Sequence, residues 1–343
     1  MVPLRRWACQ WKVQVASRRR RVFESAPMPT FRLTFALALI LCATACDREG
    51  GKKVEAAPEA KAFVSDGEGD GSVWVADGGE NGGRLFLCGT IHILREEDYP
   101  LAPGYEAAYM YSDKIVLELP PGTASGPELS RKMAQIGMYS ADAALEANVS
   151  PEAWQKVKEW GKKRGLDPSS LNRYRPWFVS LIMTATEYSV LGARSDLGVD
   201  THFEKRAKED GKPGEGLETA EFQIQLFASL SDQQQRELLD QTLAELSTVE
   251  VEYGKMIAAW KHGDLGKLQE MLFREAEKHP DLMNKFLIAR NLMWIDRLEA
   301  MIKKGEKVMV LVGTGHLTGD SGLIELLRRR GCRVRHYSEV TDF

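Results

Sequence analysis

The chain has 343 residues, with 46 Lys and Arg against 49 Asp and Glu, which gives a net charge of −3. The charge is spread unevenly, because residues 1–46 carry +7 and the rest of the chain therefore carries −10. This acidic body excludes nucleic acid as an expected partner, since binding to phosphates requires a basic surface.

The first predicted feature is an export signal. Residues 33–45 are almost entirely apolar, follow Arg32 and end in small residues, which is the pattern of a secretory signal. The run is too short to span a bilayer stably. Cys46 follows directly, so the segment resembles a bacterial lipobox in which Cys46 becomes the lipidated N-terminus, although Ala43 stands where leucine is usual. An ordinary signal peptide followed by a chance cysteine is the alternative.

Translation is expected to start at Met28. Residues 28–32 make a normal short start to the signal, whereas residues 1–27 add four consecutive arginines and no useful signal feature. Arg20 and Arg21 faintly resemble a twin-arginine export signal, but the apolar run begins well downstream of them. We expect the mature protein in the bacterial cell envelope, anchored by lipid at the periplasmic face of the inner or the outer membrane.

A flexible linker precedes the folded part of the chain. Residues 47–71 contain almost no large apolar side chains, so they cannot bury a core. We therefore expect one folded domain over residues 72–343, with a helical insertion at about 127–304.

The domain opens with β-strand signals. Residues 72–76 and 84–88 flank a turn-rich stretch, which predicts a hairpin. A helix is expected from Pro103 to about Tyr111. Residues 114–119 form a continuous apolar run, as strands that are buried on both faces do.

Helices dominate the middle of the chain. Apolar residues at helical spacing predict them, with one brief strand near 216–218. The expected helices cover residues 151–163, 177–191, 199–209, 220–230, 232–261 and 282–304.

The chain ends as it began, with strands. A strand at 307–312, a helix at 321–330 and a last strand at 332–337 are expected. The fold class is therefore α/β (α+β), with a mixed sheet built from the N- and C-terminal parts and a large helical middle. Cys88 and Cys332 lie in strand-like runs; two free thiols are expected, and a disulfide is the alternative in an oxidising compartment.

Candidate catalytic side chains follow three of the strands. His92 and His316 each stand three residues after a strand-ending glycine, within a repeated Gly-Thr-x-His sequence, and Glu118 ends the 114–119 run. Ligands bind beyond the carboxyl ends of strands in open α/β sheets. We therefore expect these three side chains to form one cluster, although the two histidines are far apart in the sequence.

Two kinds of chemistry suit this set. Two imidazoles and a carboxylate can hold a divalent metal ion with open coordination positions. They can also perform acid–base chemistry without a metal, since histidine titrates near neutral pH. A lone histidine after a strand is more often a turn residue with a satisfied hydrogen bond. Glu118 is stronger evidence for a functional site than either histidine. A carboxylate in an apolar strand is costly to bury unless it is paired with another group.

Several sequence motifs together resemble the TraB/GumN family. Residues 86–92 and 308–317 look like its paired Gly-x-x-His motifs, and the resemblance extends over about residues 85–334. The further matching segments are Val116–Glu118, Gly198–Asp200, Gly216–Glu221 with Gln225, Arg290-Asn291, and Gly319–Val334. Gly315 is a minor departure from the usual motif.

The resemblance implies a site and an activity. The family includes pheromone-shutdown proteins and the Tiki proteins, which are metal-dependent proteases. It implies that His92, Glu118 and His316 are catalytic or bind a metal such as Mn, Co or Zn. Arg290 and Glu218 match motif positions in or near the cleft, and Asn291 adjoins Arg290.

Three functional hypotheses remain open at this point. The first is a membrane-anchored, periplasm-facing, metal-dependent hydrolase that is peptidase-like, in which Glu118 binds metal or shuttles a proton and Arg290 stabilises the oxyanion. The second is a protein that binds a peptide or another small molecule without cleaving it. The third is a metal-free esterase in which a histidine acts as general base.

Overall fold

The computed structural model describes residues 69–341 except 79–80, 125, 141 and 274–279. The predicted start at Met28, the apolar export segment, Cys46 and residues 47–68 of the linker lie outside these ranges. Within them, no helix is both long and apolar enough to cross a bilayer.

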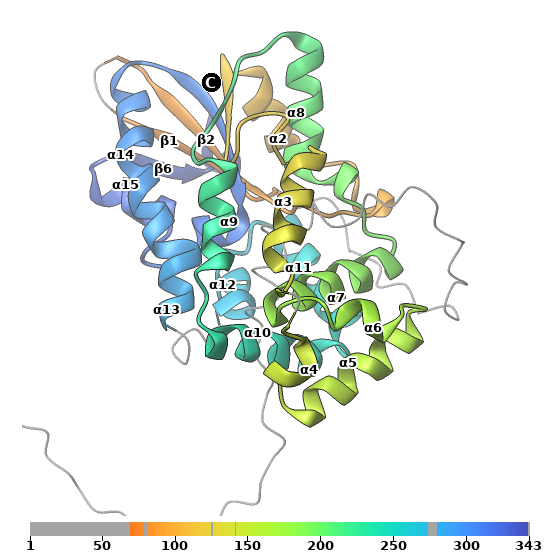
Figure 1. Ribbon diagram of the computed structural model, residues 1–343. Coiled ribbons are helices and arrows are strands. Elements are labelled where there is room, and N and C mark those ends of the chain that lie inside the picture. Colours follow the sequence, from red (N-terminus) through yellow and green to blue (C-terminus); the bar gives the residue numbers. More distant parts are fainter. Residues whose placement is uncertain (1–68, 79–80, 125, 141, 274–279, 342–343) are drawn as a thin grey trace, which may run out of the picture.

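A six-stranded mixed sheet forms the centre of the described fold, which confirms the predicted α/β class (Figure 1). Its strands run in the order β4-β3-β5-β2-β1-β6. The β1–β2 pair is the expected antiparallel hairpin, and β6 adds antiparallel to β1. The strand bounds are β1 Val73–Asp77, β2 Arg84–Thr90, β3 Lys114–Leu117, β4 Gly214–Gly216, β5 Lys307–Gly313 and β6 Arg333–His336.

The parallel half of the sheet positions the candidate residues. β5 lies between β2 and β3 and is parallel to both, with Thr90 opposite Gly313 and Leu117 opposite Leu311. These strands are apolar throughout because helices cover both of their faces. Three carboxyl ends therefore meet at one edge of the sheet. β3 stops one residue before Glu118, so this carboxylate follows its strand instead of ending it.

Helices make up most of the rest of the described chain. Several of them begin with proline, whose fixed φ and missing N–H suit a first helical turn. The α-helices are α2 Pro103–Met110, α3 Pro127–Gly137, α4 Leu145–Asn148, α5 Pro151–Lys163, α6 Pro168–Leu171, α7 Pro176–Val190, α8 Val199–Asp210, α9 Ala220–Ala228, α10 Asp232–Glu245, α11 Val249–Lys261, α12 Leu265–Phe273, α13 Pro280–Met283, α14 Ala289–Lys303 and α15 Leu323–Arg329. Short 3₁₀ helices cover Glu96–Asp98, Ser195–Leu197, Thr314–Leu317 and Tyr337–Glu339, and Asn284–Ile288 is a π-helical segment.

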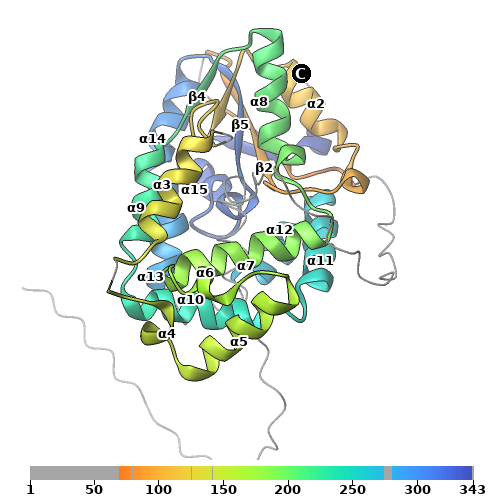
Figure 2. The same cartoon turned by 45° about the vertical axis from the view of Figure 1, so that its right-hand side comes forward.

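The buried apolar side chains form clusters on the two faces of the sheet and further clusters among the helices. One face of the sheet packs against α2, α8 and α11, and the other packs against α14 and α15. Separate clusters join α3, α7 and α9, and α5, α7 and α10. Figure 2 shows α4–α7 and α10 below the sheet and its covering helices. The predicted insertion at 127–304 is not purely helical, because β4 lies within it and joins the sheet.

Two of the expected long helices differ from the structure. The single helix expected at 232–261 is wrong, since the chain breaks between α10 and α11. Thr248 bonds back to the Glu245 carbonyl through its backbone and its hydroxyl, and such local bonds compete with helix continuation. The helix expected at 282–304 begins two residues earlier and contains the π segment Asn284–Ile288 directly before α14.

Candidate functional site

The structure brings His92, Glu118 and His316 together at the carboxyl edge of the parallel strands. The Nε2 atom of His316 lies 3.8 Å from Oε1 of Glu118. A Cβ atom placed on Gly313 would lie 3.3 Å from that oxygen, 3.8 Å from Nε2 of His92 and 3.8 Å from Cδ2 of His316. All three side chains therefore surround the last residue of β5, and only glycine leaves that space open.

Glu118 is held by one backbone group and one guanidinium. Its Oε1 accepts the N–H of Gly313 at 2.8 Å, and its Oε2 accepts from Nη2 of Arg290 at 2.5 Å. Burial alone would raise the pKa of Glu118, but the Arg290 charge, with His316, His92 and the Gly313 N–H, lowers this pKa to about 2. Glu118 is therefore an ionised carboxylate in a buried site.

Arg290 is completely buried and links two glutamates. It pairs with both oxygens of Glu218 at 2.8 Å and also donates to the carbonyl of Phe286 and to Nε2 of His316. With the bond to Glu118, all five of its N–H donors have protein acceptors. The guanidinium thus has no donor left for a substrate oxygen, and the oxyanion role predicted for Arg290 would require it to break one of these bonds.

Glu218 shares Nη2 of Arg290 with Glu118. It also accepts the indole N–H of Trp294 at 3.0 Å. Burial raises the pKa of Glu218 despite its bonds to Arg290. Both oxygens of Glu218 accept from Arg290, so Glu218 holds the guanidinium in place.

Asn291 fixes the proton position on His316. The amide nitrogen of Asn291 donates to the carbonyls of His316 and Ser321, so its oxygen must face Nδ1 of His316, at 2.7 Å. Nδ1 therefore carries the proton, and Nε2 has the free electron pair. Burial, reinforced by the Arg290 charge, lowers the pKa of His316 to about 3, so this imidazole is neutral.

Asp200 is the hydrogen-bond partner of Nδ1 of His92, as Asn291 is for His316. Its Oδ1 lies 2.7 Å from Nδ1 of His92, while Nε2 of the ring is buried without a hydrogen-bond partner. Burial lowers the pKa of His92, but Asp200 outweighs it and raises this pKa. Gly198 lets this segment come close, since a Cβ there would lie 2.3 Å from the His92 carbonyl oxygen. Sequence reasoning did not select Asp200, although the Gly198–Asp200 match was the available signal.

Gln223 is a second residue that sequence reasoning missed. It lies on α9, and its Nε2 is 3.3 Å from Oε2 of both Glu118 and Glu218. Its Oε1 is buried and has no partner. In the sequence this glutamine looks like an ordinary polar residue of a helix, so no local signal marks it.

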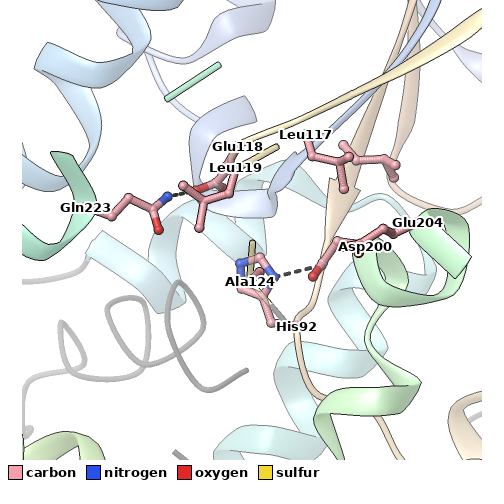
Figure 3. Close-up of a pocket in the computed structure, with 9 residues that line it drawn as sticks. His92, Leu117, Glu118, Leu119, Ala124, Asp200, Glu204 and Gln223 are labelled. Carbon is pink, nitrogen blue, oxygen red and sulfur yellow. Dashed lines mark hydrogen bonds and ion pairs between the residues drawn. The ribbon is translucent and has the colours of Figure 1, made fainter. Parts of the chain in front are cut away.

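The polar cluster borders a small cavity (Figure 3). The cavity holds about 40 Å³, and one water needs roughly 10–15 Å³. His92 projects into the middle of the view, with Gln223 on one side and Asp200 and Glu204 on the other. The lining residues are His92, Leu117, Glu118, Leu119, Ala124, Asp200, Glu204, Gln223 and Leu311.

The donor atoms of this site suit a divalent metal ion. Nε2 of His92 is an orphaned buried atom, and the space beside Gly313 would be filled by any Cβ. Two carboxylates, those of Glu118 and Glu218, pair with the one guanidinium of Arg290, and a third, that of Asp200, pairs with His92. Among the described residues, no three metal-binding side chains already close around one point. Arg290 donates to Nε2 of His316, so an ion held by this atom would have to replace that bond.

The described cysteines stand apart from this site. Cys88 and Cys332 are both free thiols, as expected, with Cys88 buried in β2 and Cys332 half-buried before β6. Burial raises the pKa of the Cys88 thiol well above its usual value, so this group is neutral and inert.

The folded region was compared with known families, proteins and structures. The model of the TraB/PrgY/gumN family matches residues 72–336. A relative described as the uncharacterized protein YbaP of Escherichia coli (strain K12) is 28% identical over 248 residues, which are 72% of this chain and 89% of the relative. The YbaP protein of Shigella flexneri is 28% identical over 242 residues, with 71% and 87% covered. No solved structure gives a significant match.

Proposed function

This chain belongs to the TraB/PrgY/gumN family, and from that membership together with the site geometry we propose that it is a metal-dependent hydrolase acting on peptide amide bonds. The observation that carries the proposal is the buried, unpartnered Nε2 of His92 beside an ionised Glu118 and a neutral His316. Neutral imidazoles and carboxylates are the protein ligands of Mn, Co and Zn, and the identity of the ion is left to experiment.

The protein groups around the site each have a defined part in the proposal. Nε2 of His92, Nε2 of His316 and Oε1 of Glu118 would hold the ion. Such an ion, when bound, makes a water more acidic and polarises a carbonyl. Asp200 and Asn291 accept the Nδ1 protons of the two imidazoles, which leaves Nε2 of each ring for the ion. Binding would displace the Nε2 proton that the raised pKa of His92 favours and the bond from Arg290 to His316.

Arg290 and its neighbours fix the carboxylate. Because Arg290 and the Gly313 N–H hold both oxygens of Glu118, the carboxylate cannot rotate away from the cavity. Gln223 adds a weaker bond to the same Oε2. We assign Arg290, Glu218 and Gln223 to this positioning task, because Arg290 and Gln223 donate to Glu118 and Glu218 accepts from both of them.

Metal analysis and chelation test the proposal directly. The purified protein should retain a stoichiometric divalent ion, measured by elemental analysis, and should cleave members of a peptide library. Chelation should remove both properties, and Mn, Co or Zn should restore them. His262 is exposed and bonded only to its own helix, so His262→Ala is a matched control that should keep the ion.

Three results would contradict different parts of the proposal. A protein that neither retains nor responds to any ion would refute the metal. Turnover that survives complete chelation would point to a histidine acting as general base. A metal-loaded protein that cleaves no peptide would refute the peptidase activity.

We also propose that the protein is anchored to a membrane through a lipid on Cys46 and faces the periplasm. The support is the apolar segment 33–45 that ends in Ala-Thr-Ala before Cys46. Cys46→Ser should leave the membrane fraction or remain unprocessed, as judged by fractionation and immunoblotting. A processed Cys46→Ser protein that still sediments with membranes would disprove the anchor.

A further inference from the structure

A second wall of the cavity carries negative charge, of which the proposed hydrolysis uses only the Asp200 oxygen that faces His92. Asp200 and Glu204 both line the cavity from α8, where residues four apart share one face of the helix. Oε1 of Glu204 accepts the N–H of Gly122 at 2.7 Å, so the loop after β3 is tied to α8. Asp200 and Glu204 therefore both lie in the cavity wall beside His92, and the bond from Gly122 holds Glu204 in place (Figure 3).

Gln223 contributes an unpaired acceptor to the same cavity. Its side chain is 1% exposed. Nε2 lies between two carboxylate oxygens, which fixes the orientation of the amide, because an oxygen there would be repelled. Oε1 is therefore the atom left without a partner. A buried acceptor without a partner is unfavourable, so this atom is available for an N–H or O–H of a ligand.

Apolar side chains complete the cavity wall. Leu117, Leu119 and Leu311 line it together with the polar groups. Apolar walls with acceptors and negative charge on either side suit a cation carried on an aliphatic stem. They do not suit a carboxylate or a phosphate, which would meet like charges.

We propose that the cavity selects substrates that carry a primary ammonium group close to the bond that is cleaved. Asp200 and Glu204 supply the opposite charge, and Oε1 of Gln223 accepts an N–H. The ammonium group belongs either to a lysine side chain or to the free amino terminus of a peptide. This inference deepens the proposed hydrolase function and rests on it.

Matched peptides test the selection. Starting from a peptide that the metal-loaded protein cleaves, lysine is moved through the positions that flank the cleaved bond, and each peptide is compared with its norleucine and glutamate versions. Each is made with a free and with an acetylated amino terminus. We expect kcat/KM to fall about tenfold or more when the ammonium is removed, since a charge-assisted hydrogen bond contributes about 1.5–3 kcal/mol. The position of the drop identifies the source of the ammonium.

Two variants locate the effect on α8. Glu204→Gln removes the charge but keeps an oxygen for the Gly122 N–H, so it should lose about tenfold in kcat/KM on the preferred ammonium peptide and little on its uncharged version. Glu209→Gln makes the same charge change on an exposed position of the same helix and should leave both values unchanged. Equal kcat/KM for charged and uncharged peptides, or equal losses in both α8 variants, would overturn the inference.

Equilibrium binding separates this inference from the proposed function. If no peptide is cleaved, the hydrolase proposal fails, and calorimetric titration of a short lysine peptide and its norleucine and glutamate versions, each with a free and an acetylated amino terminus, into the full chain still measures selection. Tighter binding of the ammonium peptides, weakened by Glu204→Gln, supports the inference. Equal binding of all versions rejects it.

Discussion

Replacing Arg290 with methionine should lower the free energy of unfolding by about 3–5 kcal/mol, the cost of leaving a buried charge without its partner. Arg290 is fully buried between Glu118 and Glu218, and its removal leaves two carboxylates near each other with no counterion. A loss of this size is a large fraction of the total stability of a typical domain. Urea unfolding followed by circular dichroism measures it.

A matched variant on the same helix controls for the loss of any arginine. Arg297, also on α14, pairs with Glu215 and donates to the carbonyl of Gly216, but its side chain is 39% exposed. Arg297→Met should therefore change stability by only about 1 kcal/mol or less. Equal stability of the two variants would show that the buried ion cluster does not hold the fold together.

Replacing either histidine of the site with alanine should abolish metal retention and lower kcat/KM by about a hundredfold or more, because a bound ion contributes several kcal/mol to the transition state. The two variants should differ in stability. His316 is 1% exposed, stacks near Trp294 and bonds both Asn291 and Arg290. Its loss leaves a buried acceptor and a buried donor unpaired, which costs about 2 kcal/mol or more.

His92 makes a smaller contribution to stability. It bonds Asp200 and otherwise borders the cavity, so His92→Ala should lose about 1 kcal/mol. Elemental analysis and thermal melting of the two variants, with His262→Ala as control, measure both effects. Retained metal in either variant would remove that histidine from the proposed ligand set.

The sequence carried strong signals for the three central residues. The Gly-Thr-x-His repeat and a glutamate next to an apolar strand identify His92, His316 and Glu118, because a buried carboxylate requires a partner. The partners themselves could not be predicted. Asp200 and Gln223 reach the site from α8 and α9, and only the packing of those helices determines which polar residue faces inward.

The fold, too, could be predicted where local sequence patterns determine it and not where contacts between distant segments do. Apolar runs predicted the strands, and prolines marked several helix starts. The place of β5 between β2 and β3 depends on pairing between distant segments, which no local pattern contains. The break at Thr248 and the π segment before Arg290 were missed, because both interrupt otherwise regular helical patterns.

The central position of β5 also bears on the order in which the molecule can assemble during synthesis. A ribosome makes β2 and β3 long before β5, which begins only at Lys307. Until then both earlier strands have an unpaired edge toward the missing strand, and such edges invite wrong partners. Glu118 also lacks the Gly313 N–H that its Oε1 accepts. A nascent chain that has not yet extended past Gly313 therefore lacks both β5 and His316, and the cluster of His92, Glu118 and His316 cannot form before those residues are made.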